Sequence, residues 1–180
     1  MSIKKWNLSV KYARAFFNLY GAQLTDIDFW QIKKAAQFLT KSRLAPTYFN
    51  LHTQVERLQL NKVFLEYFKL PADFNRLLVL LQKHKRIGLL PDVLHGVAYV
   101  FLRERAKLFF ELQSYPALSN IQQEQVVSYL ERTTGMGILY EYRENQDLLA
   151  GIRMQSEQLL YDDTIKFRLQ KIRRKLIRQN

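Results

Sequence analysis

Apolar residues recur at helical spacing through the first 105 residues, and this periodicity changes abruptly beyond them. In the clearest stretch, apolar side chains occupy every position of one helical face: Leu90, Val93, Leu94, Val97, Ala98, Phe101 and Leu102. We therefore expect a helix from about Leu89 to Lys107. The short apolar segment Leu108 to Gln113 is stopped by Ser114 to Pro116, as a strand would be. The sequence predicts a boundary near residue 105 between an all-helical half and a small α/β half.

The first half carries enough helical patterns for a bundle of six helices. Besides the helix ending near Lys107, we predict five helical segments: Val10 to Tyr20, a helix capped by Thr25 or Asp26 and reaching Leu39, a short turn opened by Pro46, a helix capped by Thr53 and reaching Phe68, and Phe74 to Gln82. The first and last of these five are apolar around most of their circumference. They are either central helices of the bundle, or part of their surface is a groove for an amphipathic helix of another protein.

The second half combines strand and helix patterns. Ser119 can cap a helix that continues to Leu130, and the glycines at 135 and 137 end it. Ile138 to Tyr142 alternates like a strand, and we predict Leu148 to Met154 as its hairpin partner because the connection between them is polar. Asp162, Asp163 and Thr164 are predicted to cap a last helix that carries one apolar stripe: Ile165, Leu169, Ile172 and Leu176.

The chain has a formal net charge of +12, which calls for an acidic partner. Residues 1–105 contain 17 Lys and Arg against 7 Asp and Glu, residues 106–163 contain 4 against 9, and residues 164–180 contain 7 against none. The basic C-terminal helix is the best candidate for binding nucleic acid or an anionic membrane surface. Its apolar stripe favours packing on a protein partner, with the cations as a solvated face.

No catalytic or cofactor signature emerges from the sequence. The chain has no cysteine, and its histidines, at positions 52, 84 and 95, are too scattered for a metal site. The glycines at 135 and 137 lack the Gly-Lys-Ser/Thr of a phosphate loop, and no Gly-x-Ser-x-Gly is present. No run approaches the roughly 18 apolar residues of a membrane span. We expect a protein that is not an enzyme and that uses no cofactor and no metal.

Three segments resemble the delta subunit family of F-type ATP synthases, which includes the oligomycin-sensitivity-conferring protein. Tyr12-Ala13-Arg14-Ala15-Phe16 is similar to the family's Tyr-Ala-x-Ala-Leu/Phe opening. The stretch Phe74 to Pro91 resembles its phenylalanine, paired leucines and basic pair, with His84 in place of the usual asparagine. Asp147 to Ile152 and Tyr161 to Ile165 resemble its hydrophobic-Gly-Gly strand and Asp-x-Ser-Ile helix start, with alanine and threonine as conservative departures.

The resemblance implies a non-catalytic stator subunit, one copy per complex, that couples proton-driven rotation to ATP synthesis. Residues 1–105 would form a six-helix bundle on the catalytic head, with an alpha-subunit N-terminal helix held between its first and fifth helices. Residues 106–180 would form the small α/β domain that grips the peripheral b stalk. On that basis, we expect an alpha-subunit site and a stalk site formed respectively by two sets of residues: Tyr12, Ala15, Phe16, Leu78 and Leu81; and Ile172, Arg173 and Leu176.

The family also implies a location. Because the chain begins almost at its first helix, with no room for a transit peptide, we expect it on the cytoplasmic side of the inner cell membrane. Its association with the membrane would be peripheral and indirect, through the complex. The alternative is a basic nucleic-acid-binding protein, whose affinity would fall steeply with salt. The stator hypothesis expects no nucleic acid, and predicts helix binding that depends on apolar residues.

Overall fold

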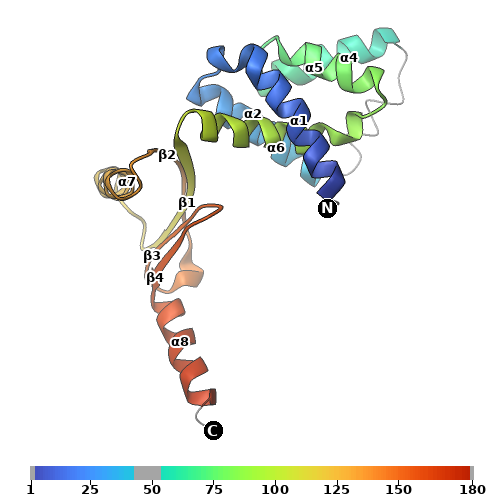
Figure 1. The fold of residues 1–180 in the computed structure, drawn as a ribbon. Helices are drawn as coiled ribbons and strands as arrows, with labels where there is room; N and C mark the ends of the chain where they lie inside the picture. Colours follow the sequence, from blue (N-terminus) through green and yellow to red (C-terminus); the bar gives the residue numbers. More distant parts are fainter. Residues whose placement is uncertain (1–2, 43–53, 179–180) are drawn as a thin grey trace. The chain divides into compact units, whose positions relative to one another are not determined.

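The computed structural model describes residues 3–42 and 54–178, and the chain divides into two compact units, Met1–Phe101 and Leu102–Asn180 (Figure 1). The first unit is helical, and the second combines a four-stranded sheet with helices. The predicted fold class, a helical N-terminal part followed by a small α/β part, is therefore confirmed. The predicted helical turn at Pro46 and the predicted cap at Thr53 lie outside the described residues.

Five α-helices lie in the described part of the first half: α1 (Ile3–Tyr20), α2 (Asp26–Lys41), α4 (Gln54–Phe68), α5 (Phe74–Lys83) and α6 (Leu90–Glu104). The start of α2 is fixed by a capping box, in which the Thr25 hydroxyl accepts from the Asp28 amide at 3.4 Å and the Asp28 carboxylate accepts from the Thr25 amide at 2.7 Å. Helix α6 ends before the predicted Lys107, because Ala106 adopts a positive φ of 49° and Lys107 begins a strand.

The core of the helical unit forms around α6, which buries the face that the periodicity predicts. Val93, Leu94 and Val97 are fully buried, and burying each such side chain contributes about 1.5–3 kcal/mol. Helix α1 crosses α6 closely at Gly96, where an added Cβ would lie 2.9 Å from the Cβ of Ala13. The side chains of α1, α2 and α5 complete this core: Ala13, Phe16, Phe29, Ile32, Leu39, Phe74, Leu78 and Leu81.

The α/β unit contains β1 (Lys107–Tyr115), α7 (Asn120–Thr134), β2 (Gly137–Glu144), β3 (Gly151–Gln155), β4 (Leu160–Thr164) and α8 (Ile165–Arg178), with strand order β2-β1-β3-β4. Strands β1 and β2 are parallel, whereas β3 is antiparallel to both β1 and β4. Helix α7 packs on one face over a core of Phe110, Leu112, Leu130 and Met154 (Figure 1). Its predicted cap is confirmed, since the Ser119 hydroxyl accepts from the Gln122 amide at 3.3 Å.

The predicted hairpin between Ile138–Tyr142 and Leu148–Met154 is wrong. A helix between two strands makes a crossover, which returns the chain parallel to the first strand, so β2 pairs with β1. The following turn then carries the chain past β1, where the Asn145 amide donates to the Ser114 carbonyl at 2.9 Å. Strand β3 consequently adds to the other side of β1, which becomes a central strand.

The structure also corrects the start of the last helix. Asp162 and Asp163 belong to strand β4, and only Thr164 caps α8, accepting from the Phe167 amide at 3.2 Å. Asp162 instead accepts from the hydroxyl of Thr164 at 2.7 Å, and Asp163 pairs with Arg168 at the base of α8. The β3–β4 pair needs glycine at 151, where φ is 101° and an added Cβ would lie 2.3 Å from the carbonyl oxygen of Asp163.

Candidate partner-binding surfaces

Two tyrosines of α1 join this helix to α5 and to the turn that follows it. The Tyr20 hydroxyl accepts a hydrogen bond from Arg76, in the first turn of α5. The Tyr12 hydroxyl lies 3.1 Å from Nδ1 of His84 and accepts from Arg86 at 3.0 Å, just beyond the end of α5. Because the later tyrosine contacts the earlier part of α5, the two helices run antiparallel.

Between these two links, exposed apolar side chains lie on both helices. Tyr12, Ala15 and Leu19 are spaced to share one side of α1, and Ala15 and Leu19 are exposed. On α5, Leu80 lies four residues after Arg76 and four before His84, so it shares their side of the helix, and it is 41% exposed. We call the exposed apolar surface formed by Ala15, Leu19 and Leu80 the α1/α5 surface.

Cations flank the α1/α5 surface. Arg76, Lys83 and Arg86 are all exposed. The guanidinium of Arg76 also lies 5.5 Å from the ring centre of Tyr20, and its hydrogen bond to that hydroxyl raises the pKa of Arg76 above its ordinary value. A guanidinium is charged at any ordinary pH, so Arg76 places a positive charge at this end of the surface. The surface has the chemistry to receive an amphipathic helix through an apolar centre and a basic rim.

The residues predicted from the sequence for this site fall into two groups. Ala15 is exposed and Tyr12 is half-buried, so both belong to the α1/α5 surface. Phe16, Leu78 and Leu81 are buried in the core of the helical unit. The Phe16 ring packs 4.4 Å from the Phe74 ring, between centroids, beneath the surface. These three side chains pack in the core beneath the α1/α5 surface and are not accessible to a partner.

The residues predicted from the sequence do not include Leu19 and Leu80, which are exposed on the same surface as Ala15. The signal was the polar neighbours on the same helical side: Leu80 has Arg76 one turn before it and His84 one turn after it. A leucine between two polar residues at a spacing of four lies at the boundary between the buried and exposed sides of a helix.

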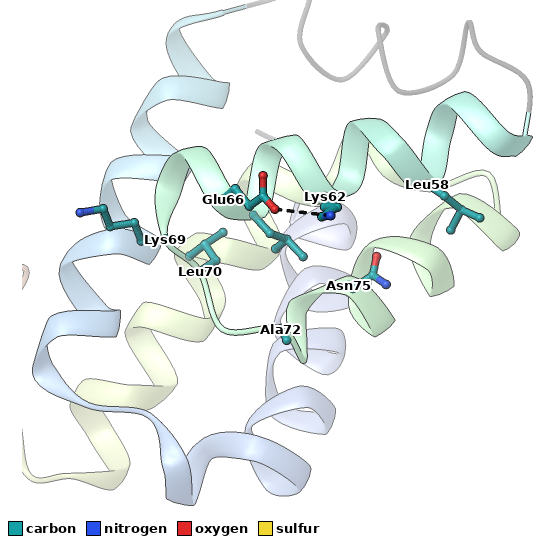
Figure 2. A pocket seen from close by; sticks show the side chains of 8 residues that line it. Leu58, Lys62, Glu66, Lys69, Leu70, Ala72 and Asn75 are labelled. Atoms are coloured by element: carbon teal, nitrogen blue, oxygen red, sulfur yellow. Dashed lines mark ion pairs between the residues drawn. The ribbon is translucent and has the colours of Figure 1, made fainter.

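A separate hollow of about 570 Å³ lies between α4 and the start of α5 (Figure 2). It is lined by Leu58, Lys62, Leu65, Glu66, Lys69, Leu70, Ala72 and Asn75. Lys62 and Glu66 form an exposed ion pair of 3.8 Å along α4, which contributes little to stability. Asn61, fully buried in α4, joins the two helices by accepting from Gln82 at 2.9 Å. The hollow gathers no set of groups suited to catalysis.

Helix α8 offers an apolar stripe in the α/β unit. Ile165, Leu169 and Ile172 are 47%, 53% and 55% exposed, and Arg173 is also exposed. Of the three residues predicted for the stalk site, Ile172 and Arg173 are thus accessible, while the side chain of Leu176 lies outside the described residues. The Ile165 amide donates to the Ala150 carbonyl at 2.9 Å, which fixes the base of the helix beside Leu149.

Across the described ranges, 3–42 and 54–178, no helix is both long enough and apolar enough to cross a membrane.

The model of the family "ATP synthase delta (OSCP) subunit" matches residues 8–176 of the chain. The chain is 26% identical over 178 residues to the ATP synthase subunit delta of Carboxydothermus hydrogenoformans, covering 97% of this chain and 99% of that one. It is 24% identical over 131 residues to the subunit delta of Clostridium acetobutylicum, covering 71% and 73%. Its fold is similar to a chain of the Toxoplasma gondii mitochondrial ATP synthase hexamer, with a TM-score of 0.62, 17% identity and coverage of 94% and 97%.

Proposed function

Because the chain belongs to the ATP synthase delta (OSCP) subunit family, we propose that its helical unit holds the N-terminal helix of an alpha subunit and that its α/β unit binds the b-type peripheral stalk. The protein is a non-catalytic stator component of F-type ATP synthase, which links the catalytic head to the peripheral stalk. The proposal assigns each end of this link to one compact unit of the chain.

The α1/α5 surface carries the first half of the proposal. It carries exposed apolar side chains on two antiparallel helices, α1 and α5, which are joined by a tyrosine contact at each end. An amphipathic helix that places its apolar side against Ala15, Leu19 and Leu80 removes these side chains from water, which supplies about 25 cal/mol per Å² of apolar area before the cost of association. The basic rim favours a partner helix with acidic flanks.

The exposed stripe of α8 supports the second half. Two separate contacts, one to the head and one to the stalk, make the protein a clamp that transmits torque from the head to the stalk. Neither contact needs to be strong alone, because linked contacts raise each other's effective concentration. We further propose that the protein lies on the cytoplasmic side of the inner cell membrane and is held there only through the complex, one copy in each.

The proposal is tested by calorimetric titration of the full chain with a peptide from the N-terminus of the same organism's alpha subunit. We expect saturable one-to-one binding that is weakened at least about tenfold by Leu80→Asp, since a carboxylate on this surface must be desolvated by the partner. Val63→Asp is the matched control, because Val63 is 60% exposed on α4 and lies opposite the Asn61 side that joins α5. Equal weakening by both variants would remove the α1/α5 surface as the site.

A further inference from the structure

The apolar stripe of α8 has the spacing of a coiled-coil seam. Ile165, Leu169, Ile172 and Leu176 follow one another at intervals of four, three and four residues, which are the d, a, d and a positions of two heptads. Their side chains at 165, 169 and 172 are about half exposed. At its base, α8 packs against β4 and the turn before β3. Beyond that base, the seam residues Leu169 and Ile172 are exposed among the residues that the structure describes.

The positions that flank this seam all carry positive charge. In the same heptads, the e positions hold Lys166 and Arg173, and the g positions hold Arg168 and Lys175. Residues 164–180 contain no Asp or Glu. In a coiled coil, the e and g residues face the partner helix across the seam and decide which partner is accepted. Two copies of α8 would place cation against cation, so self-pairing is disfavoured.

The base of α8 is held firmly enough to present this seam. Thr164 caps the helix, and the Arg168 guanidinium pairs with Asp163 of β4. Beside that base, Leu149 is exposed although it adopts a positive φ of 68°. An exposed leucine in a conformation that favours glycine is retained at a cost of about 1–3 kcal/mol, which suggests that it extends the apolar docking surface.

We propose that α8 pairs, as one member of a short two-helix coiled coil, with a protein helix that carries apolar residues at its a and d positions and Glu or Asp at its e and g positions. This inference rests on the proposed function, in which the peripheral stalk supplies the helix. It specifies the chemistry of that contact: partner choice comes from acidic residues facing Lys166 and Arg173, and the seam supplies the apolar contact area.

The probe is a synthetic peptide of three heptads with leucine at a and d and glutamate at e and g, compared with the same peptide carrying lysine at e and g. Fluorescence anisotropy with the full chain measures both affinities. We expect the glutamate peptide to bind about tenfold or more tightly than the lysine peptide. The double variant Lys166→Glu with Arg173→Glu should remove most of this preference, because only Arg168 and Lys175 then stay positive beside the seam. Leu169→Asp should abolish binding of both peptides.

The variants change exposed side chains, so circular dichroism should show an intact fold for each. Equal binding of the two peptides would overturn the proposal that the cations of α8 select a partner helix with acidic residues at e and g. Binding to vesicles of phosphatidylglycerol without binding to the glutamate peptide would assign α8 to a lipid surface instead. Self-association of the full chain that Leu169→Asp abolishes would assign the seam to a second copy. If the glutamate peptide fails but the alpha-subunit peptide still binds at the α1/α5 surface, the coiled-coil proposal falls and the stator assignment remains.

Discussion

The hydroxyl of Tyr12 accepts a hydrogen bond from Arg86 at 3.0 Å, although the two residues lie 74 positions apart in the chain. With the contact between Tyr20 and Arg76, it sets α1 alongside α5. Both links are exposed, so each contributes only a modest amount to stability. They show which sides of the two helices face each other at the two ends of the α1/α5 surface.

Replacing Tyr12 by phenylalanine removes the acceptor for Arg86 while keeping the ring. We expect the free energy of unfolding to fall by no more than about 1 kcal/mol, because the lost hydrogen bond is exposed to water. Affinity for the alpha-subunit peptide should fall by a larger factor, since the end of the surface loses its anchor. Urea denaturation and calorimetry on the same preparation separate the two effects. A large loss of stability with unchanged affinity would contradict this role for Tyr12.

Leu78 and Leu80 lie two residues apart on α5 and should respond very differently to aspartate. Leu78 is 1% exposed, and a carboxylate there replaces a packed core side chain, so Leu78→Asp should destabilise the helical unit by about 3–5 kcal/mol or more. Leu80→Asp should leave the thermal midpoint within a few degrees of the wild type and still impair peptide binding. Similar unfolding by the two variants would show that Leu80 is a core residue and not a docking residue.

Asn61 is the buried polar residue that fixes α4 against α5. Its Nδ2 donates a hydrogen bond to Oε1 of Gln82 at 3.4 Å, and its Oδ1 accepts one from Nε2 of Gln82 at 2.9 Å. Asn61→Ala should lower the free energy of unfolding by about 1–3 kcal/mol, because the half-buried amide of Gln82 loses its partner. Gln59→Ala, on the exposed side of the same helix, should change it by less than about 0.5 kcal/mol. Urea denaturation checks both values, and equal losses would argue against a specific network.

A substitution at Gly151 tests whether the β3–β4 pair supports the start of α8. Gly151→Ala places a Cβ 2.3 Å from the carbonyl oxygen of Asp163 at a φ of 101°, so β3 and β4 must separate. We expect a loss of at least about 2 kcal/mol in the α/β unit, together with weaker stalk binding. Gly88→Ala is the control, because no atom lies within 4 Å of its added Cβ. Hydrogen exchange should locate the Gly151→Ala effect in residues 151–164.

The sequence alone predicted those helices that a regular apolar period or a capping residue marks. The apolar period of α6 and the capping residues Thr25 and Ser119 predicted their helices correctly. The strand pairing was predicted wrongly because β2 and β3 follow each other along the chain and resemble a hairpin, whereas the crossover through α7 places β2 beside β1 and the turn at Asn145 carries β3 to the other side of β1. Strand β4 was not predicted because Asp162 and Asp163, which belong to it, are also residues that commonly cap a helix. On α5, the sequence-based choice of Leu78 gave weight to apolar character alone, whereas Arg76 and His84, one turn to either side of Leu80, indicate that Leu80 lies nearer to solvent.

As a clamp, one chain holds the head and the stalk at the same time through two independent surfaces. Analytical ultracentrifugation of the full chain with an alpha-subunit N-terminal peptide and a b-stalk C-terminal peptide, each carrying a different dye, measures this directly. We predict a ternary complex, from which Leu80→Asp releases only the alpha peptide and Ile172→Asp releases only the stalk peptide. Competition between the two peptides for one surface, or loss of both peptides in either variant with the fold intact, would contradict the clamp.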